Sequence, residues 1–240
     1  ELYLKRLIIG GFSKVYEIAK NFRNEGMDKN HNPEFTALEF YQAYADVYDM
    51  MDLTENIIHN VAKSINKKIL HFDNHSIDIS KTFSRRSMFG LLNEMTGQKV
   101  DTMETSDLYM LAVNENINVE KNMNYGQLLD VIFGVLVEPK LIQPTFVTDY
   151  PKAISPLAKV SRDGNCEIVE RFELFIGGME FANSFTELND PIEQRDRLTI
   201  QSKLRDLGDV EAQVLDEDFL QALEAGMPPT GGVGIGIDRL

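Results

Sequence analysis

The spacing of apolar residues in the first third of the chain predicts two strands followed by a helix. Short aromatic and β-branched runs, KVYEI and EFTALEFYQAYA, lie on either side of the polar stretch NEGMDKNHNP. This pattern is typical of two antiparallel strands joined by a long loop. From Val47 to Ile65 the apolar residues recur mostly at three- and four-residue steps, which predicts a helix with one buried face.

The middle of the chain, residues 69–140, has a mixed pattern that ends in a strongly apolar helical run, LLDVIFGVLV. We interpret it as a mostly helical insertion between two parts of one core, residues 1–68 and residues 141–240. No internal repeat, low-complexity tract or proline-rich linker divides the chain, so this division rests on changes in periodicity alone.

The last third of the chain predicts a hairpin. An extended segment, PTFVTDYP, follows Gln143 and precedes the alternating run RFELFIGGMEFANSF. The pair Gly177-Gly178 within that run is a strong signal for a two-residue turn between antiparallel strands.

Two helices and a glycine-rich strand are predicted after this hairpin. Asn189 or Asp190 can accept hydrogen bonds from the first free amides of a helix, Pro191 suits its first position, and Gly208 can end it. A second, short helix begins at about Glu217, and GGVGIGI then reads as a strand.

Composition indicates a folded globular chain. With 240 residues, 43% hydrophobic and 26% charged, it has enough apolar material for one large core. No window approaches the roughly 18 uninterrupted apolar residues of a membrane-spanning helix, and the first residues lack the pattern of a secretion signal. One cysteine, Cys166, and four scattered histidines predict neither an internal disulfide nor structural zinc. We therefore expect a protein of the reducing cytoplasm without membrane association.

The charge and the ends of the chain change this picture. A formal net charge of −14 repels a polyanion over most of the surface, so any contact with nucleic acid must be local or made by a segment outside this chain. The sequence begins without methionine and stops at GIDRL, directly after the glycine-rich run. We therefore expect a fragment of a longer protein.

A first candidate for chemistry is Arg23, in FRNEG at the end of the first predicted strand, with HNPEF where the chain returns. A planar guanidinium can hold a carboxylate and a phosphate oxygen together and offset charge that develops between them. The alternative is a strand-end arginine paired with Glu25 or Glu39.

A second candidate is the carboxylate pair Glu173 and Glu180, on either side of the glycine turn. In a two-residue hairpin Phe175 faces Glu180, so both carboxylates share one face with backbones roughly 7 Å apart. Such a pair can share a magnesium ion that holds nucleotide phosphates. An exposed acidic hairpin face is the alternative reading.

Asn183 and Glu187 lie further along the same predicted strand. Strict alternation puts both on the face opposite Glu180, which conflicts with one shared pocket. We therefore predict a β-bulge between Phe181 and Asn183, since bulges often re-aim side chains beside an active site. Without it, these two side chains would simply be solvated.

The run GGVGIGIDRL is the last candidate. Gly232, Gly234 and Gly236 alternate, which leaves one strand face without side chains so that a flat ligand can approach the backbone; close strand packing is the alternative. Arg239 follows at the expected end of the strand. The run lacks the GxGxxG spacing and the GKS or GKT ending of the common phosphate-binding loops.

Taken in order, these segments resemble the class II aminoacyl-tRNA synthetases. FRNE followed by HNPEFTALEFYQAYAD resembles motif 2, and GGVGIGIDR resembles motif 3. Within that class, ELYLKRL, LIQPTFVTDYP, RFELFIGGMEFANSFTELNDP and GMPPTGGVGIGIDRL are similar to the lysyl-tRNA synthetases. The resemblance spans nearly the whole chain and is least clear over residues 70–135.

The resemblance implies an α+β fold: an antiparallel sheet flanked by helices, with bent ATP on the sheet. Adenine would lie between Phe35 and Arg239, and Arg23 would contact the lysine carboxylate and the α-phosphate. The implied ATP-binding residues are Arg23, Glu25, His31, Asn32, Phe35, Glu173, Glu180 and Arg239, with Mg²⁺ on Glu173 and Glu180. The implied lysine-binding residues are Glu1 for the α-amino group, Arg23 and Asn183 for the carboxylate, and Glu187, Tyr41 and Glu39 for the ε-ammonium.

The implied activity is that of a lysine–tRNA ligase catalytic core. The lysine carboxylate would attack ATP, and the terminal ribose of tRNA(Lys) would then take lysine from lysyl-adenylate, with Arg23 and Arg239 as the catalytic residues and no protein nucleophile. The full-length protein would be a homodimer with motif 1 and an anticodon-binding barrel upstream. The alternatives are a paralogue that lysylates a translation factor and a non-catalytic lysine- and ATP-binding module.

Overall fold

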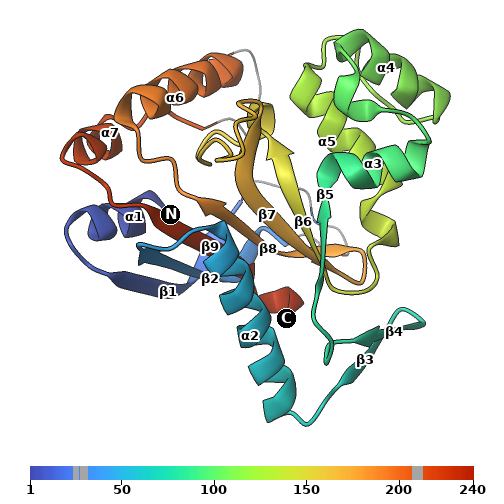
Figure 1. Cartoon of the computed structure of the whole chain (residues 1–240), viewed down its shortest axis with the longest axis horizontal. Helices are drawn as coiled ribbons and strands as arrows, with labels where there is room; N and C mark the ends of the chain where they lie inside the picture. The colour runs from blue at the N-terminus through green and yellow to red at the C-terminus, as the bar shows by residue number, and fades with distance from the viewer. Residues whose placement is uncertain (24–26, 28–31, 207–212) are drawn as a thin grey trace.

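One seven-stranded sheet organises the chain (Figure 1). The structure is a computed structural model that describes residues 1–23, 27, 32–206 and 213–240. The strand order is β1-β2-β9-β8-β7-β6-β5, and all neighbours are antiparallel except the parallel pair β5 and β6. This confirms the predicted α+β class. The strands are β1 (Lys14–Phe22), β2 (Glu34–Ala43), β5 (Ser84–Ser87), β6 (Thr145–Pro151), β7 (Ile168–Ile176), β8 (Met179–Thr186) and β9 (Thr230–Gly236), with a separate hairpin of β3 (Ile69–Phe72) and β4 (His75–Asp78).

Helices flank this sheet. In Figure 1, α1, α6 and α7 gather on one side of the molecule, and α3, α4 and α5 gather on the other. Among the described residues, no helix is both long enough and apolar enough to cross a membrane. The α-helices are α1 (Leu2–Ile9), α2 (Val47–Ser64), α3 (Met88–Thr96), α4 (Thr105–Asn114), α5 (Tyr125–Leu136), α6 (Pro191–Asp206) and α7 (Glu217–Glu224), and the short 3-10 helices are η1 (Val100–Thr102), η2 (Glu138–Lys140), η3 (Lys152–Ile154) and η4 (Ile237–Arg239).

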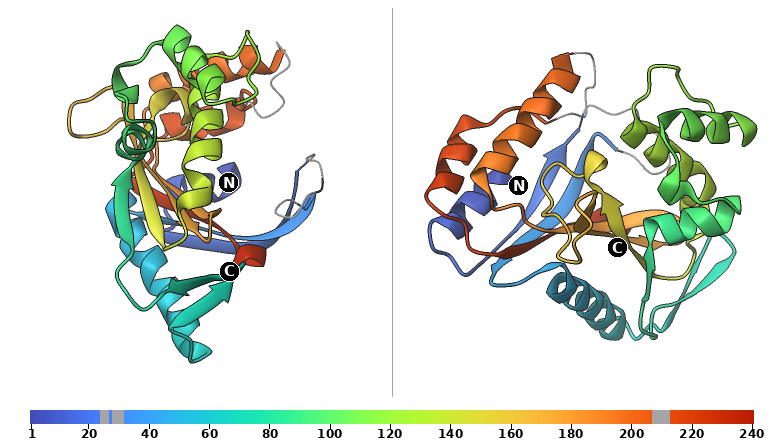
Figure 2. Two further views of the ribbon diagram at one scale, coloured as in Figure 1. Left: turned by 90° about the vertical axis from the view of Figure 1, so that its right-hand side faces the viewer. Right: turned by 45° about the horizontal axis from the view of Figure 1, so that its top comes forward.

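One face of the sheet packs on α2, the helix predicted from Val47 to Ile65. Phe40, Leu174 and Val233 lie with Met50 and Met51 of this helix in one buried cluster. The left view of Figure 2 shows α2 and the β3–β4 hairpin on the side of the molecule away from α4 and α5. This face is therefore a continuous apolar layer.

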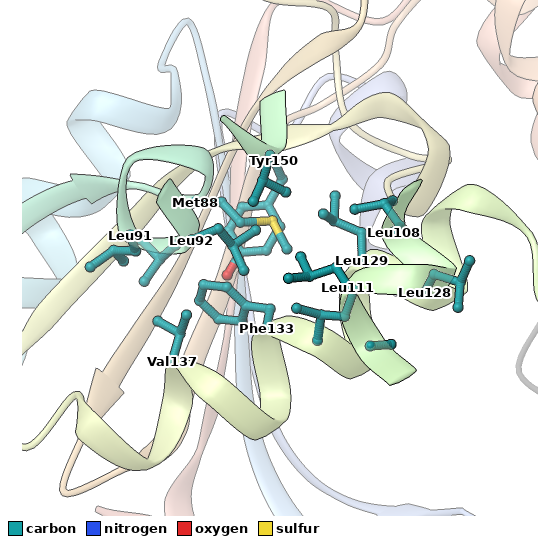
Figure 3. Close-up of a cluster of buried hydrophobic side chains, with 14 of the residues drawn as sticks. Met88, Leu91, Leu92, Leu108, Leu111, Leu128, Leu129, Phe133, Val137 and Tyr150 are labelled. Carbon is teal, nitrogen blue, oxygen red and sulfur yellow. The ribbon is translucent and has the colours of Figure 1, made fainter. Parts of the chain in front are cut away.

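The opposite face carries helices at two separate places. Figure 3 shows Met88, Phe133 and Tyr150 in the cluster that joins α3, α4 and α5 to β6 and β7. A second cluster joins α1, α6 and α7 to the sheet around Tyr41, with Ile8 buried at its centre. The candidate residues project from this face.

Residues 69–140 are less uniform than their pattern suggests. Helices occupy the stretch from Met88 onward, but β5 joins the main sheet as its edge strand through the pairing of Ser84 with Thr145. The sequence pattern did not predict this strand. The division of the chain into residues 1–68, 69–140 and 141–240 remains a prediction.

The predicted hairpin of β7 and β8 is confirmed. Gly177 and Gly178 have positive φ angles of 64° and 76°, as a type I′ turn requires. The predicted bulge is present but lies one residue earlier than expected, because Phe181 is the extra residue between the pairs Leu174–Ala182 and Phe175–Glu180.

The last elements also match their sequence signals. Asp190 caps the start of α6, since its Oδ1 accepts a hydrogen bond from the amide of Ile192 at 2.9 Å. The helix is described as far as Asp206, and the predicted stop at Gly208 lies outside the described residues. The short helix predicted from Glu217 and the glycine-rich strand are α7 and β9.

Candidate active site

Strand register brings the candidate residues onto one sheet face. Cross-strand partners project to the same side, and the bulge at Phe181 puts Glu180 and Asn183 on the side of Glu173. One row across β2, β9, β8 and β7 consists of Glu39, Gly234, Asn183 and Glu173, and the next consists of Tyr41, Gly232, Phe185 and Arg171.

Glu187 lies just past the end of β8 and is almost fully enclosed, with 1% of its surface exposed. Its amide donates a hydrogen bond to the carbonyl of Thr230 in β9 at 2.8 Å, which fixes the backbone. Neither carboxylate oxygen receives an aligned hydrogen bond from the described residues. The nearest cation is Lys5, whose Nζ is 2.7 Å from Oε2, so the contact is an ion pair by distance but lacks hydrogen-bond alignment.

Lys5 belongs to α1 and is itself only 2% exposed. Its Nζ is also 2.8 Å from Oε1 of Glu1, one turn earlier on the helix. The ammonium lies 5.9 Å from the ring centre of Tyr41 and 5.9 Å from that of Phe185. Glu39 of β2 belongs to the same group, because its charge and that of Glu1 both act on Glu187.

Burial dominates the electrostatics of this acid cluster, defined as Glu1, Glu39 and Glu187. Burial raises the pKa of Glu187 to about 7; the charges of Glu1 and Glu39 add to the rise and Lys5 opposes it. Burial also disfavours the carboxylate of Glu1, but the adjacent Lys5 ammonium lowers the pKa of Glu1 below its ordinary value. Near neutral pH, a further cation beside Glu187 would therefore stabilise its ionised form.

Gly232 makes this close arrangement possible. A Cβ at this position would lie 2.2 Å from Oε1 of Glu187 and 2.4 Å from Cε1 of Tyr41. Such distances are far inside van der Waals contact. A residue with a side chain here would force Glu187 or the buried Tyr41 ring to move.

The other end of the face carries Glu173. Its Oε2 accepts a hydrogen bond from the hydroxyl of Tyr150 at 2.7 Å, and its Oε1 pairs with Arg171. The Arg171 guanidinium lies 4.5 Å from the ring centre of Tyr150, and its Nε donates to Oδ1 of Asn183 at 3.2 Å. One arginine thus links a predicted metal ligand to a predicted lysine-binding residue.

Glu180 interacts electrostatically with Glu173, as expected for carboxylates on one face. Burial and the charge of Glu173 raise the pKa of Glu180 to about 7, whereas Arg171, Arg239 and Arg23 act in the opposite direction. Nη1 of Arg239 donates to the backbone carbonyl of Glu180 at 2.5 Å. Among the described residues no group of three or more metal-binding side chains occurs, but this carboxylate pair supplies the hard oxygen donors that Mg²⁺ prefers.

The residues from the first hairpin lie at the same end. Arg23 is exposed, and its guanidinium carbon is 5.1 Å from the ring centre of Phe35, so the two groups stack. Asn32 is exposed, while Glu25 and His31 lie outside the described residues. Oδ2 of Asp238 accepts a hydrogen bond from the amide of Thr36 at 2.6 Å, which ties η4 to β2. The placing of a base between Phe35 and Arg239 stays a prediction.

Three side chains that the sequence analysis did not select belong to this site: Lys5, Tyr150 and Arg171. Lys5 follows Glu1 by four residues on a helix, which is a recognisable signal for an ion pair. Arg171 precedes Glu173 by two residues on a strand and so shares its face. Tyr150 reaches the site from β6 and has no comparable local signal.

Comparison with known proteins agrees with the motifs. The profile of the family described as tRNA synthetases class II (D, K and N) matches residues 1–240. The chain is 53% identical over 244 residues to a lysine–tRNA ligase of Prochlorococcus marinus (strain MIT 9215), 52% over 241 residues to one of Christiangramia forsetii, and 50% over 244 residues to one of Carboxydothermus hydrogenoformans.

These alignments cover all of the chain but 48%, 42% and 49% of the respective relatives, so the chain spans about half the length of the curated relatives it matches. The predicted family is confirmed, and with it the fold class. On the match over its full length, this chain belongs to the class II tRNA synthetases of the D, K and N group.

Proposed function

We propose that this chain forms the catalytic core of a cytoplasmic enzyme that activates lysine with ATP and transfers it to tRNA(Lys). The observation that carries the proposal is Glu187, an enclosed carboxylate without an aligned hydrogen bond, close to the ring of Tyr41. A buried carboxylate is costly unless a cation compensates it. The ε-ammonium of lysine is a cation of the right kind.

The formal charges of the acid cluster and Lys5 support a ligand with two positive charges. The acid cluster of Glu1, Glu39 and Glu187 carries three carboxylates, and Lys5 supplies one buried ammonium. The negative charges of two carboxylates then remain for a ligand to neutralise. Free lysine has two ammonium groups, which we assign to Glu1 at the α-end and to Glu187 at the ε-end, with Glu39 and Tyr41 beside the latter.

The carboxylate of lysine needs donors at the other end of the same face. Asn183 accepts a hydrogen bond from Arg171 on its Oδ1, so its amide nitrogen is left to donate to a ligand. We assign this nitrogen and Arg23 to the lysine carboxylate. Arg23 also acts electrostatically on both Glu1 and Glu180, which supports a position between the amino-acid end and the phosphate end.

We assign ATP to the face near Phe35, Arg239, Glu173 and Glu180, with Asn32, Glu25 and His31 completing the nucleotide contacts. Phe35 offers a stacking surface for adenine, and the Arg23 guanidinium already stacks on it. Mg²⁺ on the carboxylate pair would neutralise phosphate charge when bound.

The reaction needs no nucleophile from the protein. The carboxylate of lysine attacks the α-phosphorus, pyrophosphate leaves, and a terminal ribose hydroxyl of tRNA then attacks lysyl-adenylate. Arg23 and Arg239 would align the two reactants and offset the charge that develops on the α-phosphate. We expect the full-length protein to act as a homodimer.

The experiment that tests this proposal is lysine- and ATP-dependent pyrophosphate exchange by the full-length protein and by Glu187→Gln. Loss of the carboxylate removes a charged pair worth about 3 kcal/mol, so the KM for lysine should rise about a hundredfold while the KM for ATP stays within about threefold. Glu94→Gln, which alters only an exposed pair with Arg86, is the matched control.

Three results would overturn the proposal. Equal losses for lysine and ATP in Glu187→Gln would refute the ε-ammonium site. No exchange by a folded full-length parent would favour a non-catalytic lysine- and ATP-binding module. Exchange without charging of tRNA(Lys), but with lysylation of a translation factor, would identify the paralogous activity instead.

A further inference from the structure

Lys5 is an unusual feature of the acid cluster, because it is a lysine with 2% exposure among carboxylates that we assign to a lysine ligand. Buried ammonium groups occur almost only when they are paired. Lys5 is paired twice, at 2.8 Å from Oε1 of Glu1 and at 2.7 Å from Oε2 of Glu187. Its side chain therefore bridges the two carboxylates assigned to the two ends of the substrate.

The bridge leaves one oxygen of Glu187 for a ligand. Lys5 lies against Oε2, whereas Oε1 has no aligned donor among the described residues and points toward the backbone of Gly232 and the edge of the Tyr41 ring. A buried carboxylate oxygen without a donor is costly. An incoming ammonium at Oε1 would satisfy it without displacing Lys5.

The charged groups around Glu187 come from a few elements. Lys5 and Glu1 face it from α1, and Glu39 and Tyr41 from β2. Arg197 of α6 donates a hydrogen bond to the carbonyl of Ala158, and Ala158 pairs with Glu187 in an isolated antiparallel β-bridge. Phe185 and Gly232 from β8 and β9 carry no charge. Among these groups, Lys5 is the cation that contacts the Glu187 carboxylate.

We infer that Lys5 is a positioning and specificity residue, which favours the ionised forms of Glu1 and Glu187 and leaves two carboxylates of the acid cluster for a ligand to neutralise. The inference rests on the proposed function and deepens it. Without Lys5, the enclosed Glu187 would lose its ammonium partner while the charges of Glu1 and Glu39 remained beside it, so Glu187 would be protonated to a greater extent at neutral pH. Lysine would then have to displace that proton before its ε-ammonium could bind.

The test is Lys5→Met in the full-length protein, which keeps the length of the side chain and removes its charge. Binding of free L-lysine without ATP is measured by titration calorimetry at about pH 7 and about pH 8.5, in buffers of different ionisation enthalpy. Relative to the parent, we expect about tenfold weaker binding near pH 7, near-parental binding at the higher pH, and more protons released per lysine bound near pH 7.

A purely structural role for Lys5 makes a different prediction. It would weaken lysine binding equally at both pH values and leave proton release unchanged, and that result would overturn the inference. The KM for ATP in pyrophosphate exchange should stay parental. Comparison with the parent at each pH cancels the titration of lysine itself.

A second variant covers the case in which Lys5→Met does not fold. Lys5→Arg keeps the charge, so the pH dependence of lysine binding should match that of the parent, while affinity falls because the wider guanidinium also covers Oε1 of Glu187. A shifted pH profile in Lys5→Arg would overturn the inference. A parent that binds no lysine at any pH would instead overturn the proposed function, and the inference would fall with it.

Discussion

Replacing Gly232 with alanine should be one of the most damaging single-methyl changes in this chain. The new Cβ would lie 2.2 Å from Oε1 of Glu187 and 2.4 Å from Cε1 of Tyr41, against an ordinary contact of 3.4–4 Å. Glu187 is 1% and Tyr41 5% exposed, so neither side chain has open solvent to move into. The strand or one of these groups must shift by about an ångström.

The magnitude follows from two contributions. Overpacking of an enclosed site costs about 1–3 kcal/mol. If Glu187 is pushed away from Lys5, the loss of a buried ion pair adds about 3–5 kcal/mol. We therefore expect Gly232→Ala to lose at least about 3 kcal/mol of the free energy of unfolding, a large part of the roughly 5–15 kcal/mol typical of a domain.

Denaturant unfolding followed by circular dichroism measures this loss, and Gly234→Ala is the matched control. Gly234 lies on the same strand and the same face, but a Cβ there would meet a single described heavy atom, Cγ of Glu39 at 4.0 Å. Its stability should stay within about 0.5 kcal/mol of the parent. Equal midpoints for the two variants would refute the packing that we describe around Gly232.

Three further changes probe other parts of the structure. Because a lysine ammonium binds the carboxylate form of Glu187, whose pKa is raised to about 7, lysine affinity should rise about tenfold per pH unit up to that value and then level off; a flat profile by calorimetry would contradict this. Arg171→Met removes the arginine partner of both Glu173 and Asn183, so the KM values for ATP and for lysine should both rise about tenfold or more in pyrophosphate exchange; an effect on one alone would break the proposed link. Asp46 accepts hydrogen bonds from the amides of Tyr48 and Asp49, so thermal unfolding should show that Asp46→Ala costs about 1 kcal/mol and Asp46→Asn much less.

Local patterns predicted the hairpin of β7 and β8 because its determinants are local. Two adjacent glycines supply the positive φ angles of the turn, and alternating residues supply the two faces. The conflict between Glu180 and Asn183 also revealed that a bulge was needed. Its position was off by one residue, because Phe181 and Ala182 both pack into the cluster on the α2 side, a tertiary contact that alternation does not encode.

Other features depend on residues that are distant in sequence. The segment Ser84–Ser87 is short, polar and mostly exposed, and it is a strand only because β6 pairs with it. The contact between Lys5 and Glu187 joins the first helix to the end of β8. The four-residue spacing of Glu1 and Lys5 predicts their ion pair, but nothing in this segment indicates that Lys5 also contacts Glu187. Long-range pairing, rather than propensity, decides these cases.

The glycines of β9 explain how so many charged groups fit over one sheet face. In the two register rows that carry these groups across β2, β9 and β8 the middle position is a glycine, so Glu39 and Asn183, or Tyr41 and Phe185, stand on either side of bare backbone. Larger residues at Gly232 would occupy the place that Oε1 of Glu187 and the Tyr41 ring now hold beside the strand. The acidic residues would still be present, but Glu187 could not keep its present position. The alternating glycines are therefore as much a determinant of the site as the carboxylates that they separate.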